Sequence, residues 1–208
     1  MKTIAFTDRD QWLQARLGKI TGTRLKDIIV KRGTEKKIGF YELIAERLMV
    51  SEEEFEGFVP NETPMDRGTR LQTIAIERFR KDTGKKVDDS LVLWTREDNE
   101  SIAISPDGVI GKTEAVETKC LSAARHVEAY ITKQVPSEYV YQTRQYFIVN
   151  DSLKTLYLTF YDPRLPAIDF FYITITRKEI EEEVTELLAY ELKELSEVDE
   201  WVNKLSKF

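Results

Sequence analysis

Residues 105–108 read Ser-Pro-Asp-Gly, and residues 116–120 read Val-Glu-Thr-Lys-Cys. Apolar, strand-forming residues adjoin both motifs, and residues 111–114, Gly-Lys-Thr-Glu, have the composition of a turn. A β-hairpin is the simplest structure for this pattern. It brings the two motifs onto neighbouring strands.

If the turn centres on Lys112, Asp107 faces Glu117 across the hairpin. Side chains alternate along a strand, so Glu117 and Lys119 project from the same face. Two facing carboxylates repel each other, and a divalent cation between them would remove that repulsion. The hairpin therefore predicts a site in which Asp107, Glu117 and Lys119 converge.

Such a trio suits metal-assisted cleavage of phosphate esters. Carboxylate oxygens bind Mg²⁺ or Mn²⁺, and a lysine beside the metal can orient or deprotonate the attacking water. The arrangement is similar to that of the PD…(D/E)xK nucleases. Two simpler interpretations compete with it, because Pro-Asp-Gly is also an ordinary turn and Glu-x-Lys an ordinary pair on a strand surface.

Length and composition suit a single folded domain over residues 1–208: 41% of the residues are hydrophobic, with 3 Trp, 9 Tyr and 10 Phe. The net charge of −6 does not by itself indicate a nucleic-acid partner. Basic residues nevertheless crowd residues 19–37, and acidic residues crowd residues 179–200. This distribution is compatible with a basic cleft and equally with solvated helix faces.

Several classes of protein are disfavoured by what the sequence lacks. The lone cysteine, Cys120, excludes a disulfide framework and a cysteine-rich zinc site, and the lone histidine, His126, argues against histidine-ligated metals and a Ser-His-Asp triad. Without a glycine-rich nucleotide loop we expect no use of ATP. No apolar run reaches membrane-spanning length and no signal-peptide pattern begins the chain, so we expect a cytoplasmic protein of a bacterium or phage-infected host.

Periodicity and turn residues predict the remaining elements. Helices are expected at residues 9–17, 21–30, 38–50, 64–82, 123–132, 136–149 and 177–205, and further strands at residues 86–94, 101–105, 155–161 and 168–175. The last helix is amphipathic, with an inward face expected to contain Ile180, Val184, Leu187, Leu188, Leu192, Leu195 and Val198.

Two helices carry polar residues of interest. In the helix over 136–149 one face gathers amides and phenols, which suits either buried structural hydrogen bonds or the holding of water and phosphate oxygens near a metal. In the helix over 64–82, Gln72 lies beside the apolar stripe. Glu77 lies about 140° away around the same helix, where we expect a solvated surface charge.

Taken together, the motifs resemble the phage lambda exonuclease family, the YqaJ-like viral recombinases. The matching features follow the family order over residues 12–164: Trp12, Arg16 to Thr23, Arg67-Gly68, Ser105 to Gly108, Glu117 to Cys120, Gln142 to Tyr146, and Tyr161 to Arg164. This resemblance implies an α/β (α+β) fold with a restriction-endonuclease-like core, in which helices flank a central mixed β-sheet. It also implies digestion of double-stranded DNA ends, often by a ring-shaped homotrimer, and a single-strand annealing protein as partner in phage recombination.

The resemblance assigns roles to the hairpin residues. Asp107 and Glu117 would hold Mg²⁺, for which Mn²⁺ can substitute, and the backbone carbonyl of Thr118 would supply a further ligand. Lys119 would assist the attacking water.

Other roles implied by the family lie outside the hairpin. Arg16, Thr23 and Ser105 would form the pocket for the terminal 5′-phosphate, which fits a cation and hydroxyls beside a helix N-terminus. Gln142 and Gln145 both fit the family's glutamine motif. Gln145 is the one expected to contact metal-bound water, with Gln142 in support.

One position departs from the family pattern, because Gln72 stands where the family has a glutamate that binds metal. An amide oxygen can coordinate but brings no charge. Three explanations stay open: a weakly held second metal, a natural difference, or an inactivating substitution.

The leading hypothesis is a Mg²⁺-dependent 5′-to-3′ exonuclease of the alkaline exonuclease type, acting on linear double-stranded DNA. One alternative is a structure-specific or restriction-type endonuclease with the same core, which would also cut a covalently closed circle. The other is a catalytically silent protein that binds DNA ends, which the amide of Gln72 makes plausible.

Overall fold

The computed structural model describes residue 11, residues 36–50 and residues 63–205. Contacts between these residues group them into two compact units. The first comprises residues 36–50, 63–71, 120–134 and 160–171; the second comprises residues 72–119, 135–159 and 172–205. That residues 1–208 form one nuclease domain stays a prediction.

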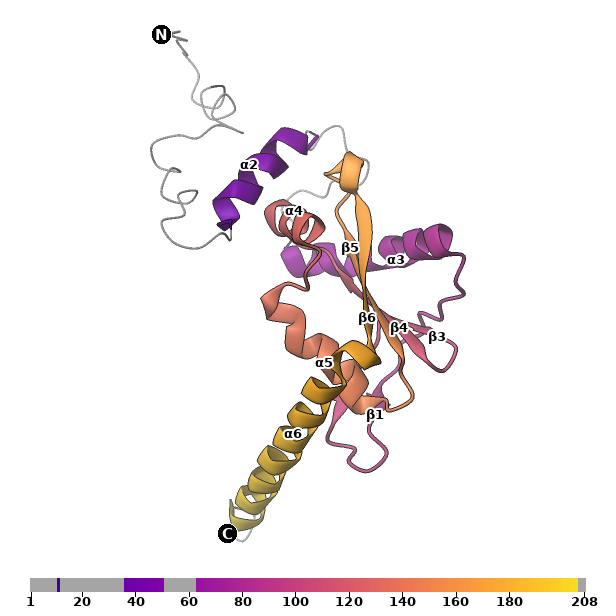
Figure 1. Cartoon of the computed structure of the whole chain (residues 1–208), viewed down its shortest axis with the longest axis vertical. Coiled ribbons are helices and arrows are strands. Elements are labelled where there is room, and N and C mark those ends of the chain that lie inside the picture. Colours follow the sequence, from indigo (N-terminus) through magenta and orange to yellow (C-terminus); the bar gives the residue numbers. More distant parts are fainter. Residues whose placement is uncertain (1–10, 12–35, 51–62, 206–208) are drawn as a thin grey trace. The chain divides into compact units, whose positions relative to one another are not determined.

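A four-stranded sheet contains β3 (Gly108–Ile110), β4 (Glu114–Lys119), β5 (Thr155–Tyr161) and β6 (Phe170–Thr176), in that order. The helices are α2 (Ile38–Leu48), α3 (Pro64–Thr83), α4 (Ala123–Thr132), α5 (Val140–Val149) and α6 (Arg177–Leu205), with short 3-10 turns at Ser137–Tyr139 and Pro166–Ile168. Figure 1 shows these elements along the chain. The predicted α/β class, with a mixed sheet and helices, is confirmed.

The hairpin formed by β3 and β4 has the predicted register. The two strands pair antiparallel, with Val109 opposite Ala115 and Gly108 opposite Val116. Gly111 has a φ of +59° in the turn, a conformation that costs glycine little because it has no Cβ. Ala115 and Val116 are completely buried and point to opposite faces of β4, so both faces of the strand are covered. A slip of one residue would exchange the side chains that meet each face.

The strand predicted over residues 86–94 is wrong for most of its length. Asp88 forms only an isolated bridge with Val109, and the regular strand is β1 (Trp94–Thr95), which pairs with β2 (Ala103–Ile104). Leu91 and Leu93 are 99% and 65% exposed. The alternation of apolar and polar residues suggested a strand here. Such a segment forms a strand only where a neighbouring strand and a core are available to it.

The helix α3 ends as predicted, at a glycine. Leu71, Ala75 and Phe79 are buried along one side of the helix, which confirms the apolar stripe. After Thr83, Gly84 has a φ of +68° and donates its N–H to the carbonyl of Arg80 (2.8 Å), as at many helix C-termini. The opposite face, including Glu77, points to solvent.

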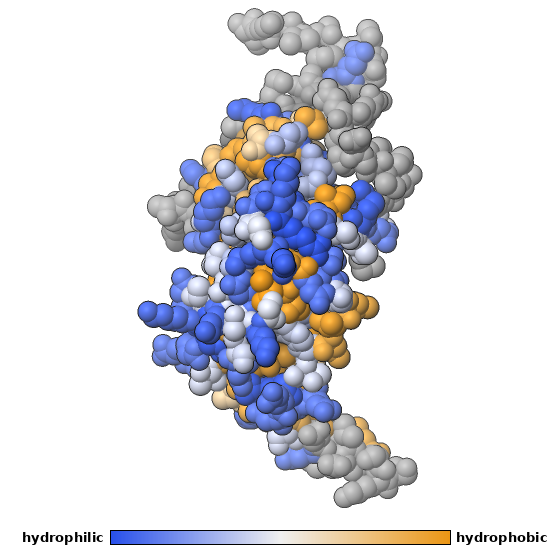
Figure 2. All heavy atoms as spheres, turned by 90° about the vertical axis from the view of Figure 1, so that its right-hand side faces the viewer, coloured by the Kyte–Doolittle hydropathy of each residue, from blue (hydrophilic) through white to orange (hydrophobic). Residues whose placement is uncertain are grey.

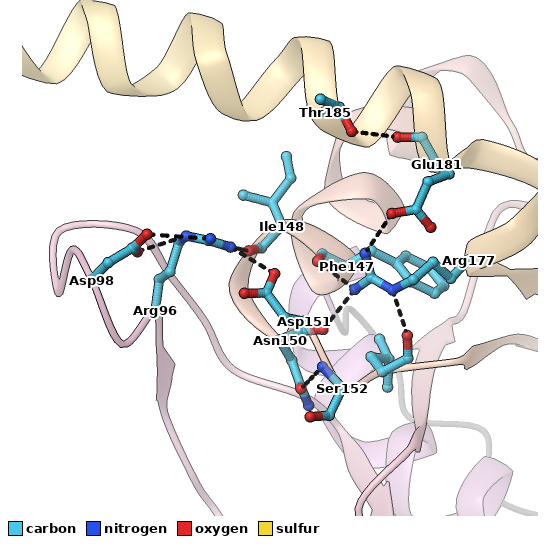
Figure 3. A network of polar contacts seen from close by, with 11 residues as sticks. Arg96, Asp98, Phe147, Ile148, Asn150, Asp151, Ser152, Arg177, Glu181 and Thr185 are labelled. Atoms are coloured by element: carbon cyan, nitrogen blue, oxygen red, sulfur yellow. Dashed lines mark hydrogen bonds and ion pairs between the residues drawn. The ribbon is translucent and has the colours of Figure 1, made fainter.

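Two arginines anchor the C-terminal end of α5 (Figure 3). Arg177 donates to the carbonyls of Phe147 (2.7 Å), Asn150 (2.8 Å) and Leu153 (2.9 Å). Arg96 donates to the carbonyl of Ile148 at 2.5 Å. Cations at this end satisfy carbonyls that lack a partner within the helix and complement its dipole, so α5 is held firmly.

In the first unit α2 packs on α4. The shared core contains Tyr41, Ala45, Ala123, Val127 and Leu165. His126 on α4 is completely buried, and its Nε2 lies 2.8 Å from the carbonyl oxygen of Ile168. Burial lowers the pKa of His126, as expected for a neutral structural histidine.

Only the beginning of α6 is buried. Ile180 and Val184 belong to the core, whereas Leu192 is 40% and Val198 is 53% exposed. The prediction that these last two residues face inward is therefore wrong, because α6 continues beyond the end of α5, as Figure 1 shows. Amphipathicity identified the helix but not the length over which it has a neighbour.

Much of the surface in Figure 2 is hydrophilic, with apolar surface in separate patches. Within the described part of the chain, no helix combines the length and the apolar composition needed to cross a membrane.

Candidate active site

The hairpin brings Asp107 and Glu117 together, as the sequence predicted. Asp107 immediately precedes β3 and Glu117 lies within β4, so the register of Gly108 with Val116 continues to this pair. The backbone N–H of Thr118 donates to Oδ2 of Asp107 at 2.7 Å, which fixes one carboxylate against the opposite strand. A Cβ at Gly108 would overlap the side chain of Val87, so glycine is required beside this aspartate.

The charge on Asp107 is poorly compensated. Burial, and then the negative charge of Glu117, raise the pKa of Asp107 to about 6, against the opposing effects of the Thr118 N–H and of Lys119. Its other oxygen, Oδ1, accepts from Nε2 of Gln72 at 2.8 Å. This is the state expected of a carboxylate that a cation would stabilise.

Glu117 is only 3% exposed, and three side chains donate to it. Lys119 Nζ lies 2.5 Å and Gln142 Nε2 2.7 Å from its Oε1, and the hydroxyl of Tyr146 donates to its Oε2. These donors satisfy a carboxylate that would otherwise be costly to bury. They also fix the direction in which its oxygens point.

Tyr146 is a site residue to which sequence reasoning gave no role. It is completely buried, and burial together with Glu117 raises the pKa of its phenol, so the hydroxyl remains a donor. A signal was present in the sequence, since Tyr146 follows Gln142 by one helical turn. The helix face of amides and phenols was expected to make buried hydrogen bonds or to hold water near a metal, and Tyr146 makes a buried hydrogen bond.

Lys119 is held between Glu117 and an aromatic ring. Its Nζ lies 4.7 Å from the ring centroid of Tyr139, in addition to its contact with Glu117. The lysine side chain is 16% exposed. Its ammonium group is thus oriented within the cluster and still reachable from solvent.

The helix α3 delivers Gln72 to the site, and Gln72 contacts Asp107 directly. A rotation of the amide group by about 180° would exchange its nitrogen and oxygen, which would turn the oxygen of Gln72 toward the place between the carboxylates where a cation would bind. Glu77 lies elsewhere: it pairs with Arg80 and its side chain is 63% exposed. The prediction that Glu77 is a solvated surface charge is confirmed.

Gln145 does not join Glu117. Its Nε2 donates to Oε2 of Glu191 on α6 at 3.5 Å. Gln142 and Gln145 lie about 60° apart around α5. α5 packs beside α6, and its Gln142 side chain reaches Glu117 of the hairpin, so the two amides meet different neighbours.

The pocket predicted for a 5′-phosphate cannot be assembled from the described residues. Arg16 and Thr23 lie outside them. Ser105, the third member, is exposed and lies two positions before Asp107.

The donor set fits a hard divalent cation. Mg²⁺ binds through one or two carboxylates and keeps several waters. Asp107 and Glu117 supply a half-buried and a buried carboxylate that repel each other. Among the described residues, no group of three or more His, Cys, Asp and Glu side chains gathers to hold a metal. The candidate centre therefore depends on this pair, with the Thr118 carbonyl and the Gln72 amide as supplementary oxygens.

Comparisons with known proteins find solved structures that are similar to this chain over most of its length. Among solved structures the chain is similar to LHK-Exo, an alkaline exonuclease from Laribacter hongkongensis, with 29% identity and a TM-score of 0.54 over 94% of this chain and 99% of that one. A structure of LHK-Exo in complex with dAMP matches with 28% identity and a TM-score of 0.55 over 94% of this chain and 99% of that one. No curated protein matches the chain.

The YqaJ-like viral recombinase domain matches residues 11–153, a span that contains every residue of the site described above. This match covers more than half of the chain. The protein therefore belongs to the YqaJ-like viral recombinase family.

Proposed function

We propose that the protein is a Mg²⁺-dependent exonuclease that digests one strand of linear double-stranded DNA from its 5′ end. The observation that carries the proposal is the cluster of Asp107, Glu117 and Lys119 on one hairpin, in a chain similar to an alkaline exonuclease. A nuclease is the coarser conclusion that the family match and both similar structures favour.

In this proposal Asp107 and Glu117 hold the cation, for which Mn²⁺ can substitute, and the carbonyl of Thr118 adds a ligand. When bound, the cation supplies Lewis-acid polarisation of the phosphate and a bound water of lowered pKa. Gln72 contributes an uncharged oxygen.

Other residues of the chain orient the reacting groups. Lys119, fixed by Glu117 and Tyr139, donates to the attacking water or to a phosphate oxygen. Gln142 and Tyr146 hold Glu117 in one orientation. Gln142 takes the place that the sequence suggested for Gln145, because it is the amide that contacts the carboxylates.

Water attacks phosphorus and the P–O3′ bond breaks, which releases a 5′-mononucleotide and leaves a new 5′-phosphate on the shortened strand. The dAMP bound to LHK-Exo is a mononucleotide of this kind. We propose that Arg16, Thr23 and Ser105 receive the terminal phosphate. From the family we further propose a homotrimer around the DNA and a single-strand annealing protein as partner.

The decisive experiment uses a linear duplex labelled at one 3′ end and a covalently closed circle, each with Mg²⁺, Mn²⁺ or EDTA. Digestion from the 5′ end gives progressively shorter fragments that keep the label, spares the circle and stops in EDTA. Immediate release of the label would reverse the polarity, and cutting of the circle would establish an endonuclease.

A silent DNA-end-binding protein is the second candidate, because Gln72 leaves the centre with only two carboxylates. It predicts retention of linear DNA on a gel with no cleavage in any metal. Cleavage by the wild type in Mg²⁺ or Mn²⁺ separates the candidates. Loss of that cleavage in Asp107→Ala and Glu117→Ala, with end binding without metal retained, assigns it to this site.

A further inference from the structure

The C-terminal half of α6 carries apolar side chains that no other described element covers. Val198 is 53% and Leu205 is 67% exposed, whereas Val184, near the start of the helix, is buried. Figure 1 shows α6 beginning beside α5 and then continuing past it. Exposed apolar surface in a continuous stripe marks an interaction site more often than scattered exposed residues do.

These residues follow a heptad pattern. From Val184 onward the seam positions alternate in steps of four and three residues: Val184, Leu188, Glu191, Leu195, Val198, Val202 and Leu205. Such a spacing keeps one narrow seam on the side of a helix and suits packing against a second helix. Packing against the protein's own core does not explain this spacing in the part of α6 that lies beyond its last contact with α5.

A hollow of about 270 Å³ adjoins the seam. Its lining is mainly apolar and comes from α6, α5 and the residues before β2: Ser101, Ile102, Gln145, Tyr190, Glu191, Glu194, Leu195 and Val198. A recess of this size has room for an apolar side chain of a partner. Interfaces commonly concentrate their binding energy in such filled pockets.

The charge on α6 is predominantly negative. α6 contains ten acidic and four basic residues, and Glu191 and Glu194 border the hollow itself. Burial raises the pKa of Glu191, and the hydrogen bond from Gln145 and the charge of Arg96 oppose this shift only in part. A partner that fits this surface brings cations beside its apolar side chains.

A second copy of this chain does not have that chemistry. In a parallel pair of α6 helices, Glu191 at the seam would meet its own counterpart. In an antiparallel pair centred on Glu194, Glu194 at the flank would do so. Both arrangements place like charges together in a partly desolvated interface, which disfavours self-association through this seam.

We infer that the exposed half of α6, together with the hollow beside Ile102, is a docking site for a basic amphipathic helix of a partner protein. The apolar residues of that helix pack along Leu195 and Val198, and one fills the hollow. Its lysine or arginine residues lie against Glu191 and Glu194. This site is separate from the carboxylate cluster and does not depend on the proposed nuclease function.

Three synthetic helical peptides test the inference against the full chain by fluorescence anisotropy. The first has leucine at the seam positions and lysine at the flanking ones; the second replaces the lysines with glutamate; the third keeps the lysines but scrambles the leucines. We expect saturable binding of the first peptide only. Binding of the first and third with equal affinity would overturn the inference, because it would reflect charge alone.

Variants locate the binding surface. Val198→Asp, at an exposed position, should weaken binding of the lysine peptide at least tenfold, and Glu194→Lys should shift the preference toward the glutamate peptide. Glu197→Lys is the matched control, because Glu197 pairs with Lys193 and lies about 200° around the helix from Leu195. The affinity of this variant for the lysine peptide should stay within twofold of the wild-type value.

The molar mass measured by light scattering tests whether a second copy of the chain covers the seam. The mass of the chain without peptide should be the same for wild type and Val198→Asp. A smaller mass for Val198→Asp would mean that another copy covers the seam, and equal loss of peptide binding in Glu197→Lys would mean that no defined site exists. Both results would refute the assignment.

Discussion

The hydrogen bond from the hydroxyl of Tyr146 to Glu117 can be tested by changing a single residue. Tyr146→Phe keeps the buried ring and removes only the donor to Glu117. Partners that orient a metal ligand typically contribute about ten- to hundredfold to metal affinity or activity. We expect cleavage to fall at least tenfold, with partial rescue by higher Mn²⁺, as measured by titrating the metal in the DNA digestion assay.

Tyr141→Phe is the control for this variant. Tyr141 lies on the same helix but is 71% exposed, so its loss should leave the rate unchanged. Equal rates for wild type and Tyr146→Phe would show that Gln142 and Lys119 suffice to orient Glu117.

Gln72 gives a second prediction at this scale. In Gln72→Glu the donor to Asp107 becomes a third carboxylate, which repels Asp107 in EDTA and adds a charged ligand when Mg²⁺ is present. The melting temperature should fall in EDTA, rise more steeply with Mg²⁺ than that of wild type, and be accompanied by faster cleavage.

Glu77→Gln changes an exposed side chain on the same helix and should affect neither quantity. If Gln72→Glu left metal affinity and cleavage unchanged while Glu77→Gln abolished activity, Glu77 would be the ligand.

Among the elements, α5 positions the site. Its side chains contact the hairpin, and an arginine holds its C-terminal end in place. Gln142 and Tyr146 face the hairpin, and Arg177 holds the carbonyl of Phe147 in the last turn and those of Asn150 and Leu153 just after it (Figure 3). Arg177→Met retains much of the stem over Phe147 but leaves these carbonyls without their cation. Loss of charged hydrogen bonds should cost about 3 kcal/mol of unfolding free energy, measured by urea denaturation.

Lys178→Met tests whether the effect belongs to that anchor. Lys178 is the next residue and is exposed, so its removal should change stability by less than about 0.5 kcal/mol. Similar losses in both variants would place the effect in the general charge of α6 and not in the end of α5.

At the scale of the whole molecule, the free energy of unfolding depends on pH through Asp107. Its pKa rises from the ordinary 3.8 to about 6 in the folded, metal-free chain. Between these values the folded state binds more protons than the unfolded state, so the contribution of Asp107 to stability falls as pH rises.

Asp107→Asn cannot ionise and should gain stability relative to wild type as the pH rises from about 4 to about 6, with a constant advantage above that range. Paired thermal melts in EDTA measure this difference. Added Mg²⁺ should reverse it, because only the aspartate can hold the ion. A difference independent of pH would mean that Asp107 has an ordinary pKa.

The sequence by itself determined the hairpin, its register and the meeting of Asp107 with Glu117. These follow from local rules: Gly111 permits the turn, and alternation along β4 places Glu117 and Lys119 on the same face. The bounds of α6, Arg177–Leu205, were likewise read from periodicity. Such features need only neighbours in the chain.

Tertiary structure decided which partner each side chain meets. Gln142 and Gln145 look equivalent in sequence, yet one contacts Glu117 and the other Glu191, because α5 packs beside two different elements. For the same reason Val184 is buried and Val198 is exposed on one continuous seam. Periodicity fixes the direction of a side chain around its helix, whereas only packing over long sequence separations fixes what lies in that direction.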